Sequence, residues 1–400
     1  MRINMKFIGG ILLIIGTSLG GGMLALPIGT AASGLFNTGL ALIGCWLAMT
    51  LCAFFILEVN LYLPKGANMI SMAQITLGRP GKMVTWITYL FLLYALISAY
   101  IAGGSDLLQS FLSQFSLNIP SQLITLLYVS CFASLVYCGI SLVDKVNSAL
   151  MYVKLTVYFL LLLLIAPKVS LEKLQGGQWF YLKNAVMLLI ASFGFAIIVP
   201  TLRDYFDDDI EQLKKVIFLG SLFPLFCYLA WVAAIMGVVP KEGHYGLVHL
   251  LHDKHATSGL AHALEYAIHQ PTISHLFQFF SSISMLTAFL GVSLCLFDFL
   301  SDGLSLKKKG KEGYLITSLV FIPPLGLVLF YPGIYIQAMQ YAGMICVVLL
   351  LFLPALMVYV GRYYQHRNSK AFVTPGGKLS VILILGFSIA LLIHKIYQWL

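Results

Sequence analysis

The chain has 400 residues, of which 60% are hydrophobic and only 10% are charged, and its formal net charge is +9. Soluble domains carry about 25% charged residues, so this composition excludes a water-soluble globular protein and indicates one integral membrane domain. The positive charge does not indicate nucleic-acid binding, because the lysines and arginines lie between apolar segments.

Apolar segments of roughly 20 residues or more, the length that a bilayer core requires, occur eleven times. They are 6–33, 37–63, 83–112, 120–142, 148–167, 181–202, 213–239, 271–302, 313–331, 334–361 and 378–398. The longest connection, 240–270, is expected to hold one or two short surface helices. The seven cysteines lie inside these segments without disulfide or zinc-ligand spacing, so neither a metal nor another cofactor is expected.

The positions of lysine and arginine predict the orientation. Seventeen of the 24 lie at the N-terminus or in every second loop after it, six lie on the other side, and Lys154 lies within a segment. Cytoplasmic loops carry the excess of such residues. We therefore expect a multi-pass membrane protein with a cytoplasmic N-terminus and, because the number of segments is odd, an external C-terminus.

The first segment contains an unusual run, Gly16–Gly22, with four glycines and two hydroxyl residues, followed by Pro27. Glycine weakens a helix by about 1 kcal/mol relative to alanine. Within a membrane, irregular backbone is tolerated where it lines a cavity, and its free N–H and C=O groups then bind ligands. The run predicts a broken helix that holds a substrate, although close packing of small residues is the alternative.

A similar interruption recurs five segments later, where Ala191–Phe195 is followed by Pro200. Corresponding interruptions in two halves of opposite orientation are typical of transporter binding sites. The sequence therefore predicts an all-α transporter of one domain over 1–400. Its inverted repeats would cover about 6–167 and 181–361, with an extra helix at 378–398.

The run Gly16-Thr17-Ser18-Leu19-Gly20-Gly21-Gly22-Met23-Leu24-Ala25-Leu26-Pro27 resembles the first helix of the hydroxy and aromatic amino acid permeases. Further matches cover nearly the whole chain. They are Leu57–Val59, Tyr94–Ala95, Ala99–Ile101, Gly139–Asp144, Ser192–Phe195, Phe289–Val292, Leu296–Asp298 and Phe330–Pro332. The resemblance looks strongest to tyrosine-specific permeases. One position departs from them, because Ala196 stands where we expect a histidine.

This resemblance implies a fold like that of the bacterial leucine transporter LeuT, with five helices, five inverted helices and one extra, the first and sixth being discontinuous. It also implies proton-coupled amino acid uptake across a bacterial inner membrane, and a lysine that replaces a sodium ion between the first and eighth helices. Lys154 resembles that lysine. Snorkelling to the cytoplasmic surface is the alternative, although charged residues within spans are functional by default.

The two interruptions supply the predicted substrate site. The N–H groups of Gly20, Gly21 and Gly22 would begin a half-helix whose positive end favours a carboxylate. Carbonyls near Gly16 and Thr17, and near Ala191 and Ser192, would end the other half-helices, whose negative ends favour an ammonium. Other predicted substrate-binding residues are Ser18, Tyr94, Ser98, Phe193, Gly194 and Phe195, although aromatic residues are more often core.

For coupling, the predicted residues besides Lys154 are Ser284 and Thr287, whose hydroxyls lie in the eighth segment, and Glu58, the only acid of the second. Glu58 is equally well explained as a buried structural acid. Seven of the nine histidines lie within 244–275, where a solvated loop is favoured over a zinc site because the spacings form no known signature.

Together these features predict a proton-coupled importer of aromatic amino acids, with tyrosine favoured and tryptophan second, rather than an enzyme. The expected partners are the substrate, protons and the lipid bilayer. Sodium coupling is an alternative, although Lys154 would repel the ion. A metal-dependent membrane enzyme using the histidine-rich loop is another alternative. A channel is disfavoured, because no ring of like charges or repeated filter sequence is present.

Overall fold

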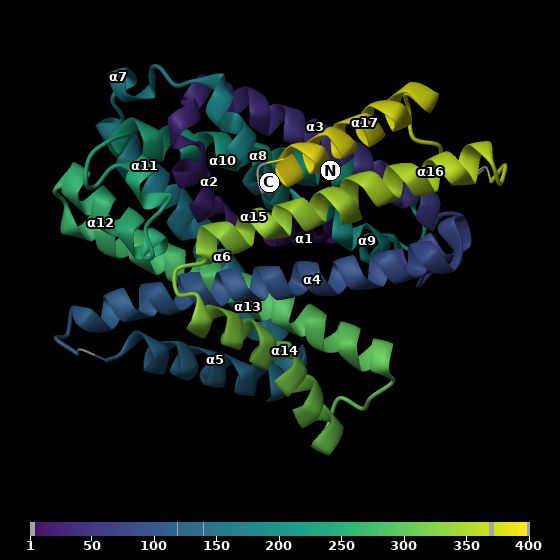
Figure 1. Ribbon diagram of the computed structural model, residues 1–400, viewed down its shortest axis with the longest axis horizontal. Coiled ribbons are helices and arrows are strands. Elements are labelled where there is room, and N and C mark those ends of the chain that lie inside the picture. The colour runs from purple at the N-terminus through teal and green to yellow at the C-terminus, as the bar shows by residue number, and fades with distance from the viewer. Residues whose placement is uncertain (1–4, 118, 139, 368–371, 398–400) are drawn as a thin grey trace.

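The computed structural model describes residues 5–117, 119–138, 140–367 and 372–397, and every regular element in these ranges is helical (Figure 1). Several predictions fall outside the described residues or side chains: those for Arg2, Gly139–Asp144, Lys145, Lys370 and residue 398.

The elements follow the predicted segments closely. The long or paired helices are α1 (Met5–Ser18) with α2 (Gly22–Thr30), α3 (Leu35–Asn60), α4 (Met69–Ser113), α5 (Ser121–Cys138), α6 (Ile140–Ile165), α8 (Leu182–Ser192) with α9 (Val199–Tyr205), α10 (Ile210–Val238), α13 (Pro271–Leu304), α14 (Gly310–Phe330), α15 (Tyr335–Cys346) with α16 (Leu353–Tyr363), and α17 (Gly377–Tyr397). The connections hold the shorter helices α7 (Leu171–Leu174), α11 (Leu247–Leu250) and α12 (Ala256–Ile268).

Nine helices of the described ranges are long and apolar enough to cross a membrane, and the bent pair formed by α1 and α2 makes a tenth. The predicted segment 120–142 contains α5, whose apolar part is shorter, at Ser121–Tyr137. The prediction of many membrane-spanning helices is confirmed, whereas the count of eleven stays a prediction that depends on α5.

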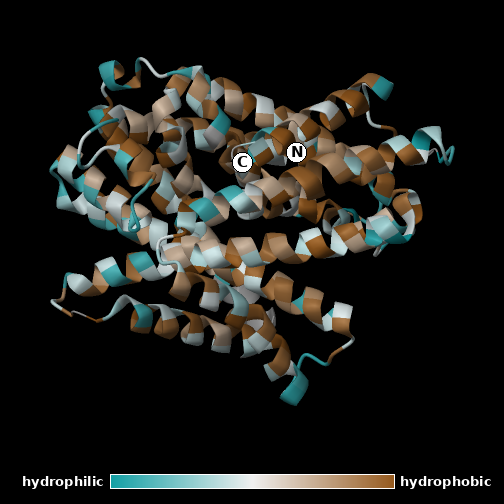
Figure 2. Ribbon diagram, in the orientation of Figure 1, coloured by the Kyte–Doolittle hydropathy of each residue, from teal (hydrophilic) through white to brown (hydrophobic). Residues whose placement is uncertain are grey.

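Hydrophilic residues gather at two opposite ends of the molecule, with hydrophobic helices between them (Figure 2). In Figure 1, α11 and α12 lie at the left end, and the loop between α13 and α14 lies at the lower right. The predicted external loop 240–270 and the predicted cytoplasmic loop 303–312 are thus far apart, as a protein with two aqueous faces requires.

The first predicted break is present. Helix α1 ends at Ser18, α2 begins at Gly22, and the two helices meet at 52°. The sixth segment is also irregular. There α8 ends at Ser192, a 3₁₀ turn named η4 follows at Gly194–Ile198, and α9 begins with Pro200 in its first turn. Proline is favoured at that position because its missing N–H would have no helical partner.

Helix α4 differs from the prediction, because it begins at Met69 rather than near residue 83. Its first part turns at Gly78, whose φ of 73° and ψ of −159° interrupt the helix. Glycine adopts positive φ without the steric cost of a Cβ, and Pro80 follows two residues later. The Asn68 side chain caps the new start by accepting a 3.0 Å hydrogen bond from Ser71 N.

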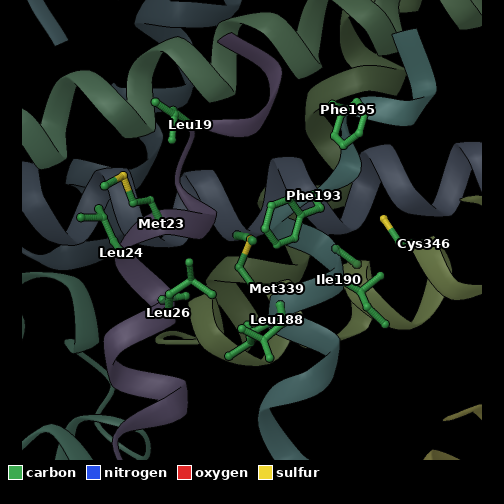
Figure 3. Packing of buried hydrophobic residues seen from close by; sticks show 14 of the residues in the cluster. Leu19, Met23, Leu24, Leu26, Leu188, Ile190, Phe193, Phe195, Met339 and Cys346 are labelled. Carbon is green, nitrogen blue, oxygen red and sulfur yellow. The ribbon is translucent and has the colours of Figure 1, made fainter. Parts of the chain in front are cut away.

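A second irregularity lies in the segment after α15. A π-helix named η5, Val347–Phe352, joins α15 to α16. Helices α2, α8 and α15 pack together beside the two breaks, with α3 against α8 and α4 against α15. Figure 3 shows Met23, Leu188, Phe193 and Met339 in this packing, all almost fully buried. The breaks are therefore enclosed in the centre of the helical bundle.

Candidate functional site

The carbonyl groups of the first break accept hydrogen bonds from three different helices. Tyr228 of α10 donates to the Ser18 carbonyl at 2.5 Å, and Lys154 of α6 donates to the Leu19 carbonyl at 2.5 Å. Tyr335 of α15 donates to the Gly21 carbonyl at 2.5 Å. Buried carbonyls need donors, and at the break the backbone supplies only the irregular bonds of a tight turn, from Gly20 N to the Ser18 carbonyl at 2.8 Å and from Leu24 N to the Gly21 carbonyl at 3.1 Å. Side chains therefore add donors to carbonyls that have lost their regular helical bonds.

Lys154 joins three elements. Its side chain is 2% exposed, and Nζ also lies 3.2 Å from Thr287 Oγ1 on α13. Thr287 in turn donates to the Ser284 carbonyl at 3.2 Å. Lys154 therefore contacts both segments that the sequence indicated, the first through the Leu19 carbonyl and the eighth through Thr287. The buried Ser284 hydroxyl has no hydrogen-bond partner among the described residues.

Tyr228 connects the two breaks. Besides the Ser18 carbonyl, its hydroxyl lies 2.8 Å from the Ser192 carbonyl, which is the last of α8. Its ring is fully buried and meets Phe193 edge to face, with centroids 5.2 Å apart. Sequence reasoning did not identify Tyr228 or Tyr335, because neither stands in a motif that distinguishes it among 21 tyrosines. Only Tyr228 offers a signal, a hydroxyl in the middle of an apolar segment, whereas Tyr335 stands at the start of one.

The glycines of the break are closely packed. A Cβ at Gly21 would lie 2.6 Å from Tyr100 Cε1 and 2.9 Å from Met285 Sδ, so only glycine fits there in this arrangement. At Gly22, Met339 Cε and Ser192 Oγ would both lie 3.2 Å from a Cβ. The amides of these glycines begin α2, where a helix leaves its first N–H groups without helical acceptors.

The polar side chains at the breaks bond mainly to their own helices. Thr17 is exposed and donates to the Ile14 carbonyl at 2.9 Å, and Ser192 donates to the Leu188 carbonyl at 2.9 Å. The buried Ser18 hydroxyl has no partner within the described part of the chain. Backbone groups, rather than these hydroxyls, dominate the site.

The predicted side-chain pocket is only partly assembled. Phe193 and Phe195 are fully buried next to the break, and no atom lies within 4 Å of the Cβ position of Gly194. Tyr94 and Ser98 lie elsewhere. Tyr94 donates to the Leu319 carbonyl of α14 at 2.8 Å, and both residues line an apolar cavity of about 800 Å³ with α14 and α15.

Glu58 and Lys154 belong to different hydrogen-bond networks with no shared partner. Its carboxylate accepts two hydrogen bonds from Arg362, at 2.6 and 2.5 Å, and one each from Tyr62 and the Thr374 amide. Glu58 is 1% exposed and the Arg362 side chain 7%. These contacts favour the structural explanation of Glu58, because they join α3 to α16 and to the segment that leads into α17.

The predicted external end contains a buried carboxylate. Asp106 of α4 accepts hydrogen bonds from His255 Nδ1 at 2.7 Å, from Thr257, and from the amide and hydroxyl of Ser258. The hydrogen bond to Asp106 raises the pKa of His255. Asp106 therefore holds the N-terminal end of α12, where a negative charge is favourable.

Histidines of the same loop line an open cavity of about 860 Å³. The described residues include no group of three or more side chains that could hold a metal.

At the opposite end, Asp207 pairs with Lys6 at 2.8 Å and with Lys65 at 3.1 Å. Hydrogen bonds from Lys6 and then Lys65 lower the pKa of Asp207 to about 2. Nearby, the buried Arg203 donates to the Asn60 carbonyl and pairs with Asp208. The start of α1 is thus tied to the loop between α9 and α10.

Comparisons with known proteins agree with this arrangement. The sequence model of the tryptophan/tyrosine permease family matches residues 3–395. The chain is 29% identical over 399 residues to the tyrosine-specific transport system 2 of Haemophilus influenzae, and the match covers 98% of this chain and 97% of the relative. It is 28% identical over 404 residues to glutamine transporter 2 of Aliivibrio fischeri, with 98% and 100% covered.

A solved structure has the same fold. A mutant manganese transporter of Eremococcus coleocola superposes with a TM-score of 0.63 at 14% identity, covering 97% of this chain and 85% of the other. The family match excludes the metal-dependent membrane enzyme that the histidine-rich loop left open. The chain is a multi-pass membrane transporter, and it belongs to the tryptophan/tyrosine permease family.

Proposed function

We propose that the protein is a proton-coupled importer of aromatic amino acids in a bacterial inner membrane, with tyrosine as the first candidate and tryptophan as the second. The observation that carries the coupling is the buried Lys154, whose ammonium joins the broken helix to α13. The family and its tyrosine-specific relative support the substrate class. The similar glutamine transporter makes glutamine a necessary comparison in any assay.

The proposed architecture counts α5 as a span, which gives eleven. Two inverted repeats of five, at about 6–167 and 181–361, precede α17, as in LeuT. The solved transporter of the same fold supports a transporter architecture. The placement of 17 of the 24 lysines and arginines supports a cytoplasmic N-terminus and an external C-terminus.

The proposed site binds both charged ends of an amino acid. The substrate carboxylate would meet the amides of Gly21 and Gly22 at the positive end of α2, whereas the Gly20 amide, also predicted for this role, donates to the Ser18 carbonyl at 2.8 Å. Its ammonium would meet the carbonyls of Ser18 and Ser192, which end α1 and α8. The side chain would extend past Gly194, beside Phe193 and Phe195, where aromatic rings favour offset or edge-on contact.

Lys154 is the proposed coupling residue, with Thr287 and Ser284 beside it. When protonated, its ammonium holds the Leu19 carbonyl and the Thr287 hydroxyl together across three helices. Loss of the proton removes the charge from this contact, which frees α1 and α2 to move relative to α13. A sodium ion at the same carbonyl would be repelled by the lysine. Glu58 is the next candidate for the proton.

The decisive experiment measures uptake of labelled tyrosine, tryptophan and glutamine into proteoliposomes, with proton and sodium gradients imposed separately. We expect concentrative uptake of an aromatic amino acid with a proton gradient alone. The Lys154→Ala variant should no longer accumulate the substrate against its gradient, but the substrate should still equilibrate across the membrane. Lys154→Arg should not restore concentration, because arginine does not release its proton in proteins.

Lys173→Ala is the matched control. Lys173 also donates from Nζ to a backbone carbonyl at 2.5 Å, that of Val238, but away from both breaks. It should behave like the wild type. Concentrative uptake by Lys154→Ala without sodium would refute the role of Lys154, and uptake driven only by sodium would refute proton coupling.

A further inference from the structure

The hydroxyl of Tyr228 occupies the point where the carbonyl ends of α1 and α8 converge. Its oxygen lies 2.5 Å from the Ser18 carbonyl oxygen and 2.8 Å from that of Ser192, and the side chain is fully buried. Both carbonyls carry the partial negative charge of a helix C-terminus. A donor at this point therefore stabilises two buried acceptors that belong to different helices.

A tyrosine hydroxyl carries a single proton, so it donates to one carbonyl at a time. A primary ammonium carries three protons and can bond both carbonyls at once. The two groups are therefore alternative donors for the same pair of acceptors. When the Tyr228 hydroxyl is the donor, the Ser18 and Ser192 carbonyls do not need a bound substrate ammonium.

We propose that Tyr228 takes the place of the substrate ammonium while the carrier returns across the membrane empty. This inference rests on the proposed function, in which the ammonium of an amino acid binds the carbonyls of Ser18 and Ser192. The loaded carrier has the ammonium as a donor, and the empty carrier has the Tyr228 hydroxyl. Without either donor, two buried carbonyls lose their bridge and the empty carrier moves more slowly.

The positioning role of Tyr228 has a specific consequence. Net uptake requires the empty carrier to return in every cycle, whereas exchange of internal for external substrate uses the loaded carrier in both directions. Removing the hydroxyl should therefore slow net uptake and leave exchange intact. A purely structural role would slow both processes alike.

The test compares Tyr228→Phe with the wild type in proteoliposomes, using labelled tyrosine or tryptophan, whichever the wild type takes up. Net uptake into empty vesicles should fall by about tenfold or more, equivalent to about 1.4 kcal/mol in the barrier, because the two buried carbonyls lose the hydroxyl that bridges them. Exchange into vesicles preloaded with unlabelled substrate should stay within about twofold of the wild type. The Phe193 contact is retained, because the ring remains.

Tyr158→Phe is the control. Tyr158 of α6 is 1% exposed, and its hydroxyl donates at 2.8 Å to the Cys227 carbonyl, which lies in the middle of α10 rather than at the end of a broken helix. The Tyr158→Phe variant should keep both net uptake and exchange. Replacement of Tyr228 by p-aminophenylalanine, which restores an N–H donor, should recover net uptake, and it serves as the test if the phenylalanine variant does not fold.

Equal losses of exchange and net uptake in Tyr228→Phe, or no loss of either, overturn the inference while the proposed function stands. Loss of net uptake with the p-aminophenylalanine replacement also overturns it. If the wild type neither concentrates nor exchanges these amino acids, the proposed function fails, and the inference fails with it.

Discussion

The contact between Asp106 and the start of α12 allows a quantitative prediction. Asp106 is 9% exposed and accepts four hydrogen bonds from His255, Thr257 and Ser258. Asp106→Asn keeps the shape of the side chain but removes its charge and turns one acceptor into a donor. We expect the loop that carries α12 to detach more readily from α4 in this variant.

The magnitude follows from the bonds that are weakened. Hydrogen bonds to a charged group contribute roughly 1.5–3 kcal/mol each, against about 1 kcal/mol for neutral pairs. The His255 side chain is 59% exposed, so its share is screened by water and stays below about 1 kcal/mol. The weakened bonds from Thr257 and Ser258 therefore lower the free energy that holds α12 against α4 by roughly 2–3 kcal/mol. This loss corresponds to about a 30- to 160-fold change in the opening equilibrium.

Hydrogen–deuterium exchange of the backbone amides of α12 measures this opening directly. Asp106→Asn should raise their exchange rate by the factor given above. Glu265→Gln is the control, because it makes the same chemical change at an exposed position of the same helix and should have no effect. An Asp106→Asn variant whose α12 exchanges within twofold of the wild type would refute the reasoning.

The same contact predicts a pH dependence. Asp106 raises the pKa of His255, with Asp253 also raising it and Lys254 lowering it. A raised pKa in the docked state means that the stabilisation is fully present below the undocked pKa, near 6.5, and is lost as the pH rises through the docked value. After correction for intrinsic rates, α12 should exchange faster at pH 8 than at pH 5.5. This difference should disappear in Asp106→Asn.

Two further predictions concern the helices themselves. Glu58→Gln should lower the free energy of unfolding by about 3–5 kcal/mol, because it leaves the buried Arg362 without its charge partner. Thermal unfolding in detergent measures the loss, and an unchanged unfolding midpoint would contradict the structural role. Gly21→Ala should abolish transport, because its Cβ would lie 2.6 Å from Tyr100, whereas Gly291→Ala, with no atom within 4 Å of the added group, should transport normally. Equal uptake by both variants would show that the break adapts to a side chain.

Much of the backbone could be predicted from the sequence. The break after Ser18 follows from the local run Gly16–Gly22, and the irregular turn after Ser192 from Gly194 with Pro200, because both effects act through neighbouring residues. Lys154 was identifiable because a cation inside an apolar segment is costly without partners. These features depend on composition within a few residues, which a sequence displays directly.

The side chains that meet the break could not be predicted in the same way. Tyr228 is 210 positions from Ser18 in the chain, and Tyr335 is 314 positions from Gly21, so only packing brings them together. The third span shows the same limit. Tyr94 and Tyr100 are six residues apart, roughly 240° around a helix, so they cannot both face the break. The structure places Tyr100 there and turns Tyr94 toward α14.

Two of the three donors at the break, Lys154 and Tyr228, are displaced by different events, and this difference bears on coupling. In the proposed mechanism, the Lys154 contact with Leu19 responds to a proton, because lysine is a donor whose charge depends on protonation. The Tyr228 contact with Ser18 responds to a competing donor, the substrate ammonium. Ser18 and Leu19 are consecutive residues, so proton and substrate would act on adjacent carbonyls of one irregular turn. A change at either carbonyl alone would leave the other bond holding the turn in place. Coupling would then require no long pathway between two distant sites, because rearrangement of the turn would depend on both contacts.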